Sequence, residues 1–206
     1  YILKDGVPNN GNAREKIQPG DIKFKDINRD GVVNDYDLTI IGNPNPKHIG
    51  GFGNNFQYKN FDLNVFFQWS YGGDVLNANR IEFEGGDPNA RTSLNMFASF
   101  ANRWTPENQT NELYRIGGQG PAVYSSRTIE DGSFLRLKTV SLGYRLPNAW
   151  LKKINIKSLR VYASAQNLIT WTRYSGPDPE VSTRPTALTP SFDWSPYPRP
   201  RVDISF

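Results

Sequence analysis

Twelve residues near the start of the chain, DINRDGVVNDYD from Asp26 to Asp37, carry oxygen-bearing side chains at the spacing of a calcium-binding loop. An EF-hand-type loop takes its ligands from positions 1, 3, 5, 7, 9 and 12, and a glycine at position 6 makes its sharp turn. Gly31 occupies position 6. The ligand positions would be filled by Asp26, Asn28, Asp30, the carbonyl of Val32, Asn34 and Asp37. We therefore expect a metal site in this loop.

The ion expected in this loop is calcium, in a structural role. Hard oxygen ligands without His or Cys favour calcium over zinc or copper, although a six-coordinate geometry also admits magnesium. One departure from the pattern is Asp37, which stands where a bidentate glutamate is usual. The alternative is a turn without metal, because Asn, Asp and Gly favour turns on their own.

The composition excludes several other kinds of chemistry. The 206 residues contain no cysteine, so the chain has no disulfide, zinc–thiolate site or cysteine nucleophile. The single histidine, His48, argues against a Ser-His-Asp triad. Asp178 and Glu180 lie in a Pro-rich loop that we expect to be flexible, whereas glycoside hydrolysis needs two carboxyl groups at a set separation. A net charge of +4, spread along the chain, argues against nucleic acid. We therefore expect no catalytic residues and no enzyme, and the sequence identifies no substrate-binding residue.

Apolar and polar residues alternate in five segments, which predicts strands with one apolar and one polar face. In the second segment the odd positions are apolar and the even positions are polar, with Phe66 as the exception. In the third segment Leu135 and Leu137 are out of phase with Val140 and the residues after it, so we expect a bulge near Lys138. The segments are His48–Tyr58, Asn60–Tyr71, Phe134–Leu146, Leu159–Trp171 and Arg201–Phe206.

The connections between these segments are short at one end and long at the other. Lys59-Asn60 predicts a two-residue hairpin turn, and the connection that starts PNAWLKK after Leu146 is also compact. By contrast, Gly72–Asp131 spans 60 residues, and a long Pro-rich connection follows Trp171. This arrangement is typical of a membrane β-barrel, whereas a soluble β-sandwich, the alternative, rarely carries such a loop.

Five strands are too few to form a closed barrel. Each edge strand would leave backbone groups unpaired, which the hydrocarbon of a bilayer does not tolerate. We therefore expect the chain to be part of a larger barrel, and the last part, because the final strand ends at the aromatic Phe206. The chain has no apolar run of about 18 residues that would predict a membrane-spanning helix.

Three stretches of the chain resemble the SusC/RagA-type TonB-dependent outer-membrane transporters of Bacteroidetes. Residues 19–77, which begin PGDIKFKDINRDGVVNDYD, resemble the late part of the barrel in that family. DGSFLRLKTVSLGYRLP at 131–147 and LRVYASAQNLITWTRYSGPDPEVS at 159–182 resemble its last strands and final extracellular loop. The resemblance covers most of residues 19–206 in the right order.

The resemblance implies an all-β fold of antiparallel strands, the C-terminal portion of a transmembrane barrel of about 22 strands with long extracellular loops. It implies an importer of oligosaccharides or peptides in the bacterial outer membrane, in contact with outer-membrane lipids and energised by TonB. The rest of the barrel and the plug of the same transporter would be partners of this segment. A SusD-like lipoprotein would close the extracellular mouth.

The expected topology divides the chain into two parts. Residues 1–47 would form an extracellular segment with the calcium loop at 26–37. Residues 48–206 would form the last barrel strands, with periplasmic turns and long extracellular loops at 75–130 and 174–196 that could reach the lipoprotein. The alternative function is a secreted, calcium-stabilised β-sandwich that binds carbohydrate or hydrolyses glycosides.

Overall fold

A computed structural model describes residues 18–85, 95–118, 124–184, 186, 188–194 and 202–205. Within these residues the regular secondary structure is mostly β-strand, with short helices in the connections. Most of the expected segment 1–47 is described, but residues 1–17 and the terminal Phe206 lie outside the described residues. The chain divides into two compact units, the first made of Tyr1–Gly42, Leu76–Ile129 and Asp193–Ser195, and the second of Asn43–Val75, Glu130–Phe192 and Pro196–Phe206.

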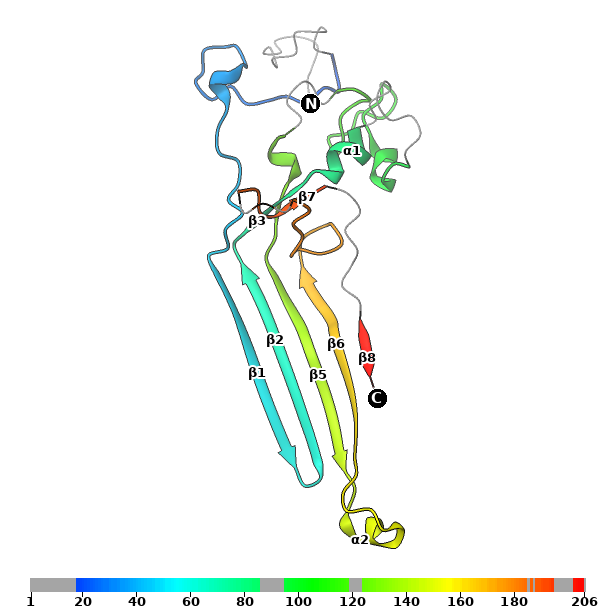
Figure 1. The fold of residues 1–206 in the computed structure, drawn as a ribbon. Helices are drawn as coiled ribbons and strands as arrows, with labels where there is room; N and C mark the ends of the chain where they lie inside the picture. Colours follow the sequence, from blue (N-terminus) through cyan, green and yellow to red (C-terminus); the bar gives the residue numbers. More distant parts are fainter. Residues whose placement is uncertain are drawn as a thin grey trace. The chain divides into compact units, whose positions relative to one another are not determined.

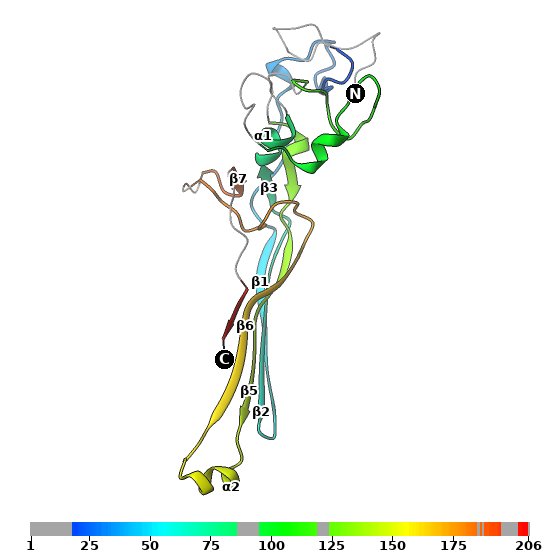
Figure 2. The same cartoon turned by 90° about the vertical axis from the view of Figure 1, so that its right-hand side faces the viewer.

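Five antiparallel strands of the second unit form one sheet in the order β1-β2-β5-β6-β8. The four long strands run side by side in Figure 1, and Figure 2 shows them nearly edge-on as a single layer. The predicted all-β class is confirmed, and the ends of the long strands lie within one residue of the predicted ends. The strands are β1 (His48–Tyr58), β2 (Phe61–Tyr71), β5 (Phe134–Arg145), β6 (Arg160–Thr172) and β8 (Asp203–Ser205).

Short connections close one end of this sheet. Lys59 adopts a left-handed φ of 52° in the predicted two-residue turn, and β1 then pairs with β2 from Tyr58↔Phe61 to His48↔Tyr71 without a register shift. A positive φ at the first turn residue matches the twist of a tight hairpin. The connection from β5 to β6 contains α2 (Asn148–Leu151) and η4 (Lys152–Ile154) and lies at the same end of the sheet as the β1–β2 turn (Figure 1).

The register gives the sheet two chemically different faces. Phe52, Phe67, Leu137 and Ile169 lie opposite one another across β1, β2, β5 and β6. On the other face Asn55, Asn64, Ser141 and Ser164 form a polar row, and the amide of Asn64 donates to that of Asn55. The apolar face is open to solvent in this chain, since Phe52 is 55% exposed. The sheet therefore presents an unpartnered apolar face and a polar face.

A bulge at Lys138 brings the two halves of β5 onto the same faces. The pairing with β2 shifts between Phe66↔Thr139 and Phe67↔Leu137, so Lys138 is an extra residue in β5. The extra residue reverses the side-chain alternation, and Leu137 thereby shares the apolar face with the later residues of the strand. The predicted bulge near Lys138 is confirmed. β6 compensates with a left-handed Asn167, φ 52°, at the matching position.

The segments between the long strands, and the segment before β1, contain secondary structure that the alternation did not predict. Three short strands form a second sheet in the order β4-β3-β7. Among the described residues, no helix is long and apolar enough to cross a bilayer. The additional elements are η1 (Asp35–Asp37), β3 (Asp74–Asn77), α1 (Asn79–Gly85), η2 (Ala98–Asn102), η3 (Ser126–Thr128), β4 (Ile129–Asp131) and β7 (Phe192–Asp193).

Candidate functional site

The Asp26–Asp37 loop is folded by side-chain carbonyl and carboxylate oxygens that accept hydrogen bonds from its own backbone. The carboxylate of Asp26 accepts from the N–H groups of Arg29 (2.6 Å) and Gly31 (2.8 Å). Asn28 accepts from the N–H of Asp30 (3.0 Å), and Asp30 accepts from the N–H of Val32 (2.8 Å). The bonds of Asn28 and Asp30 to the N–H two residues ahead are those of Asx turns, and Asp26 reaches three and five residues ahead. The loop therefore reverses direction through local polar contacts.

Asp37 joins the two ends of this loop. One oxygen of its carboxylate accepts from the N–H groups of Ile27 (2.7 Å) and Asn28 (3.3 Å), and the other accepts from the N–H of Asn34 (2.8 Å). Asn34 caps η1 by accepting from the N–H of Tyr36 (2.8 Å). The backbone bonds from Asn34 and then Ile27 hold the pKa of Asp37 below its ordinary value of 3.8, because they stabilise the ionised carboxylate.

The predicted ligands have the right chemistry for calcium, but they are engaged with the backbone. Asp26, Asp30 and Asp37 each accept from backbone N–H groups. Among the described residues, no three or more His, Cys, Asp and Glu side chains gather into a group that could hold a metal ion. These hydrogen bonds are what the metal-free turn requires, and calcium binding stays a prediction.

A second polar centre, missed in the sequence analysis, surrounds Arg136 on the polar face of β5. The guanidinium donates from Nη2 to Asp178 (2.6 Å), from Nη1 to Glu180 (2.5 Å) and from Nε to the hydroxyl of Thr170 (3.0 Å). Gln68 donates to the other oxygen of Glu180 (3.2 Å). Only 2% of the Arg136 side chain is exposed. The expectation that Asp178 and Glu180 lie in a flexible loop is wrong, because both bind one buried arginine.

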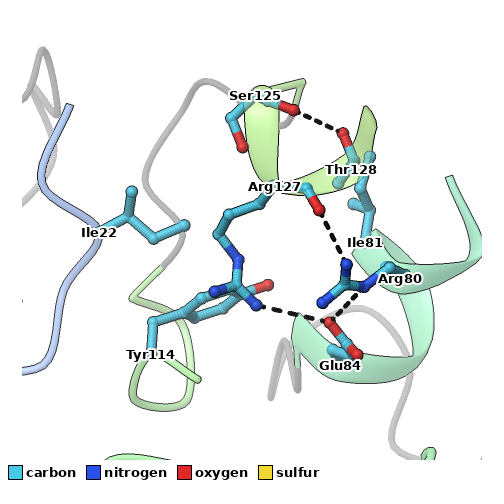
Figure 3. Close-up of a pocket in the computed structure, with 8 residues that line it drawn as sticks. All are labelled: Ile22, Arg80, Ile81, Glu84, Tyr114, Ser125, Arg127 and Thr128. Atoms are coloured by element: carbon cyan, nitrogen blue, oxygen red, sulfur yellow. Dashed lines mark hydrogen bonds and ion pairs between the residues drawn. The ribbon is translucent and has the colours of Figure 1, made fainter. Parts of the chain in front are cut away.

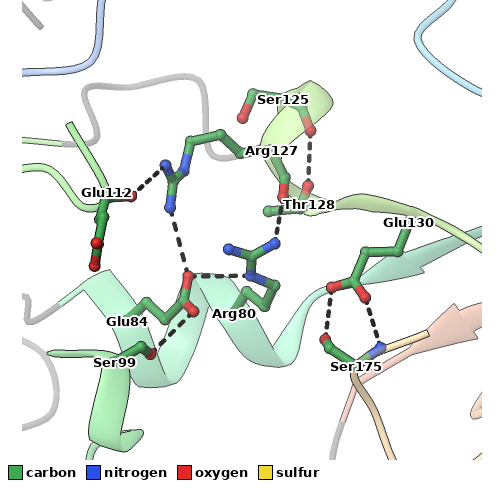
Figure 4. A network of polar contacts seen from close by, with 9 residues as sticks. All are labelled: Arg80, Glu84, Ser99, Glu112, Ser125, Arg127, Thr128, Glu130 and Ser175. Atoms are coloured by element: carbon green, nitrogen blue, oxygen red, sulfur yellow. Dashed lines mark hydrogen bonds and ion pairs between the residues drawn. The ribbon is translucent and has the colours of Figure 1, made fainter. Parts of the chain in front are cut away.

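The connection after β6 is attached to its own unit at two further places. Its first residues bring Tyr174 and Val181 into a buried apolar cluster with Val75. Glu130 accepts from both the N–H and the hydroxyl of Ser175, each at 2.8 Å (Figure 4). A Cβ on Gly176 would lie 2.4 Å from the Tyr174 ring, so only glycine allows this ring to fold over the turn. Residues 174–181 are therefore an ordered part of the second unit.

A third ion pair lies toward the other end of the polar face. Arg160 on β6 donates from Nε (3.0 Å) and Nη2 (2.5 Å) to the two oxygens of Asp62 on β2. The two side chains reach each other across β5 at Gly143, where a Cβ would lie 2.6 Å from the carboxylate. Both side chains are more than a third exposed, in contrast to Arg136.

In the first unit, Glu84 on α1 is the centre of a buried charge network (Figures 3 and 4). Its carboxylate binds Arg80 (3.1 Å) and Arg127 (3.6 Å) and accepts from Ser99 (3.2 Å). Arg127 also donates to the backbone carbonyl of Glu112 (3.0 Å). The cavity beside this network has a volume of about 10 Å³, which is too small for a ligand.

Aromatic side chains line a hollow of about 690 Å³ at the end of the long strands opposite the hairpin turn. Trp69 donates to Nδ1 of His48 (3.1 Å), and His48 stacks on Tyr71 with ring centroids 5.1 Å apart. Trp171 lies opposite Leu135 in the register of the apolar face. His48 therefore has a packing role, which agrees with the expectation that it is not catalytic.

Sequence comparison shows that the chain is similar to TonB-dependent receptors. The chain is 40% identical to TonB-dependent receptor P3 of Formosa agariphila over 166 residues, which are 81% of this chain and 16% of that receptor. It is 32% identical to TonB-dependent receptor SusC of Bacteroides thetaiotaomicron over 202 residues, 97% of this chain and 18% of SusC. No protein-family model matches the chain.

Solved structures agree with the sequence relatives. The structure of the RagAB peptide transporter matches with a TM-score of 0.62 and 32% identity, over 75% of this chain and 16% of the matched chain. The RagAB peptide importer in its closed-closed state matches with a TM-score of 0.64 and 31% identity, over 78% of this chain and 17% of the matched chain.

These relatives define the class of the protein as TonB-dependent receptors. Within that class the chain is a segment of the SusC/RagA type, which confirms the resemblance seen in its sequence. It spans less than a fifth of the length of the relatives that it matches. The relatives are receptors and transporters, so the prediction that the chain is not an enzyme is confirmed, and the secreted sandwich or glycosidase alternative was wrong.

The contacts of Asp37 predict that its ionisation orders the loop. Because the folded pKa lies below 3.8, the stabilisation is present above about pH 4 and is lost as the pH falls through the folded pKa. Asp37→Asn should speed hydrogen exchange of residues 26–37 at neutral pH. It should also remove the increase in exchange that the unsubstituted loop shows when Asp37 becomes protonated at low pH. Hydrogen exchange of the full receptor, compared at equal intrinsic rates, measures both effects. Asp35→Asn is the control, and equal exchange in the two variants would contradict the prediction.

Proposed function

We propose that this chain forms the C-terminal part of the wall of an outer-membrane β-barrel that imports oligosaccharides or peptides with energy from TonB. The observation that carries the proposal is the five-stranded single-layer sheet with one apolar and one polar face. A barrel wall needs this construction, because one face contacts lipid and the other contacts the aqueous interior. The family of the chain supports the same assignment.

In this proposal the apolar face contacts the outer-membrane lipids. Rows such as Phe52, Phe67, Leu137 and Ile169 would lie in hydrocarbon, which removes the cost of their exposure to water. The opposite rows, with Asn64, Gln68, Arg160 and Gln166, would face the lumen or the plug. The open backbone edges at β1 and β8 would pair with the remaining strands of the barrel.

The orientation across the membrane follows from the lengths of the connections. Transmembrane barrels have short periplasmic turns and longer extracellular loops. The Lys59-Asn60 turn and α2 would then be periplasmic. The Asp26–Asp37 loop and the connections at 75–130 and 174–196 would be extracellular. This orientation places the long connections where a SusD-like lipoprotein could dock, and the names SusC and RagAB among the relatives support such a partner.

The assignment of the two faces can be tested with adjacent residues on β2. Val65→Lys would put a charge on the lipid face, which costs about 2–4 kcal/mol near the middle of a bilayer. Asn64→Lys would put the same charge on the lumen face at almost the same depth. We expect Val65→Lys to reduce the folded receptor in outer membranes and Asn64→Lys to leave it near the unsubstituted amount. Heat-modifiable migration on gels measures the folded fraction, and equal losses in both variants would contradict the proposal.

The lipoprotein partner can be tested by purification from native membranes. Affinity capture of the full receptor in mild detergent should recover one lipoprotein in stoichiometric amount, because a lid that closes the mouth buries a large interface. Deletion of residues 95–118 should reduce this recovery, and the folded fraction is measured in parallel because the deletion also removes Ser99 and Glu112 from the Glu84 network. Mass spectrometry of the captured material gives the measurement. Recovery of the folded receptor with no stoichiometric lipoprotein would count against the partner.

We further propose that the Asp26–Asp37 loop binds calcium outside the cell. The support is the spacing of its hard oxygen donors together with Gly31, whose φ of 85° makes the sharp turn expected at position 6. The loop would hold the ion with Asp26, Asn28, Asp30, the carbonyl of Val32, Asn34 and Asp37. The ion would neutralise the carboxylates and tie the two ends of the loop together.

Calcium binding predicts slower hydrogen exchange in the loop when calcium is present. An affinity of about 10⁻⁴–10⁻³ M would suffice at extracellular concentrations. Millimolar calcium should slow exchange of residues 26–37 relative to a chelator, and the double variant Asp26→Asn, Asp30→Asn should abolish the difference. Asp35→Asn, which changes a carboxylate outside the ligand positions, should keep it. An unsubstituted receptor with identical exchange in calcium and chelator would show that the loop is a metal-free turn.

A further inference from the structure

The connection after β6 folds back over the polar face of the sheet. Arg136 stands on that face of β5, and its guanidinium binds Asp178 and Glu180 of the connection at 2.6 and 2.5 Å. Glu180 then reaches Gln68 on β2 (3.2 Å). One arginine and one glutamate therefore connect the returning chain to two neighbouring strands, and the position of the connection on this face is defined by specific contacts.

Burial makes the Arg136 contacts costly to break. The Arg136 side chain is 2% exposed and that of Asp178 is 7% exposed. If one partner is removed, the other is left charged and poorly solvated. The forked guanidinium binds two carboxylates at once, and a lysine cannot reproduce this geometry. The tip of the connection is therefore held more firmly than an exposed surface loop.

Two other contacts hold the same connection at its base. Tyr174 and Val181 pack on Val75, and each of the three is at most 5% exposed. Glu130 holds Ser175 by two hydrogen bonds. The apolar cluster and this carboxylate act on residues on both sides of the Asp178–Glu180 turn, so the segment is held within the second unit at its base as well as at Arg136.

We propose that Arg136 is a positioning residue that holds residues 174–182 as a fixed inward shelf on the polar face, and that this shelf narrows the route taken by cargo. The shelf itself is defined by contacts within the second unit. Its effect on cargo rests on the proposed function, since only a lumen-facing shelf narrows a passage.

The shelf changes which residues of this connection can meet a partner. The whole of 174–196 was expected to be an extracellular loop able to reach the lipoprotein. Residues 174–182 instead contact other residues of the second unit, and Phe192 and Asp193 are buried, so fewer residues of this connection can meet an external partner. Cargo that passes along the polar face would meet Glu180 and Gln68, whose side chains lie at the exposed border of the cluster.

The first experiment tests whether Arg136 holds residues 174–182 in place. It measures hydrogen exchange of these residues in the full receptor. Arg136→Lys and Asp178→Asn should each speed exchange by about tenfold or more, because a lysine cannot bind both carboxylates at once and Asp178→Asn removes the buried partner of the guanidinium. The double variant should be no faster than the faster single variant, since both substitutions break one contact. Asp62→Asn, which breaks an exposed pair on the same face, should leave exchange of 174–182 unchanged. Additive effects of the two substitutions on the exchange rate, or fast exchange in the unsubstituted receptor, would contradict the role of Arg136 in holding this segment.

The second experiment tests the narrowing of the passage. Gln166 lies on the polar face, farther from the loops than Arg136, because it pairs with Thr139. Gln166→Cys, as the only cysteine of the receptor, should react with a small water-soluble maleimide in native membranes. A maleimide carrying a large polyethylene glycol should react several-fold faster when Asp178→Asn and Glu180→Gln are added. An unchanged rate would overturn the shelf as a constriction.

A neighbouring cysteine separates failure of the shelf from failure of the proposed function. Ala165→Cys lies on the apolar face, next to Gln166 in β6. If the sheet is a barrel wall, Ala165→Cys should resist the small water-soluble maleimide that labels Gln166→Cys. Equal labelling at both positions would refute the barrel wall, whereas the exchange experiment would still report whether Arg136 holds the segment.

Discussion

The structure depends on one constraint: a single layer of strands has two faces and no interior of its own. The buried apolar residues in the described part of the chain lie mainly in the connections, and Phe134 is the only one within the four long strands. Along those strands large apolar side chains such as Phe56 and Val161 are more than half exposed. Hydrogen bonds between strands satisfy the backbone but do not cover these side chains. The sheet is therefore stable only when apolar groups from outside this chain cover that face.

This constraint explains why alternation predicted the sheet so well. When the two faces contact different phases, a shift of one residue in register would exchange them, so the pattern must persist along the whole strand. The exception at Lys138 was visible in the sequence because Leu135 and Leu137 fell out of phase with Val140. A bulge is the physical means of restoring the phase, and the register shift lies at Lys138.

The connections were not predictable in the same way, because contacts between residues far apart in the sequence determine them. Arg136 and Asp178 are 42 residues apart, and no periodicity links them. The available signal was an arginine on the polar face of a strand and two unassigned carboxylates in a later loop. Glu84 and Arg127 in the first unit present the same difficulty. The Asp26–Asp37 loop differs from these clusters, because its hydrogen bonds join residues at most ten positions apart. Its turn could therefore be predicted from the local sequence.

The ion pairs on the polar face show how burial gives similar side chains different roles. Asp62 and Arg160 remain accessible to water, so solvent screens their contact and it contributes little to stability. Arg136 is buried with Asp178, and removal of one partner from such a pair costs about 3–5 kcal/mol. A buried pair contributes little net stability compared with apolar packing, but it penalises every arrangement in which the two charges separate. The Arg136 cluster therefore selects one position for the returning chain, whereas the Asp62–Arg160 pair only adds polarity to the face.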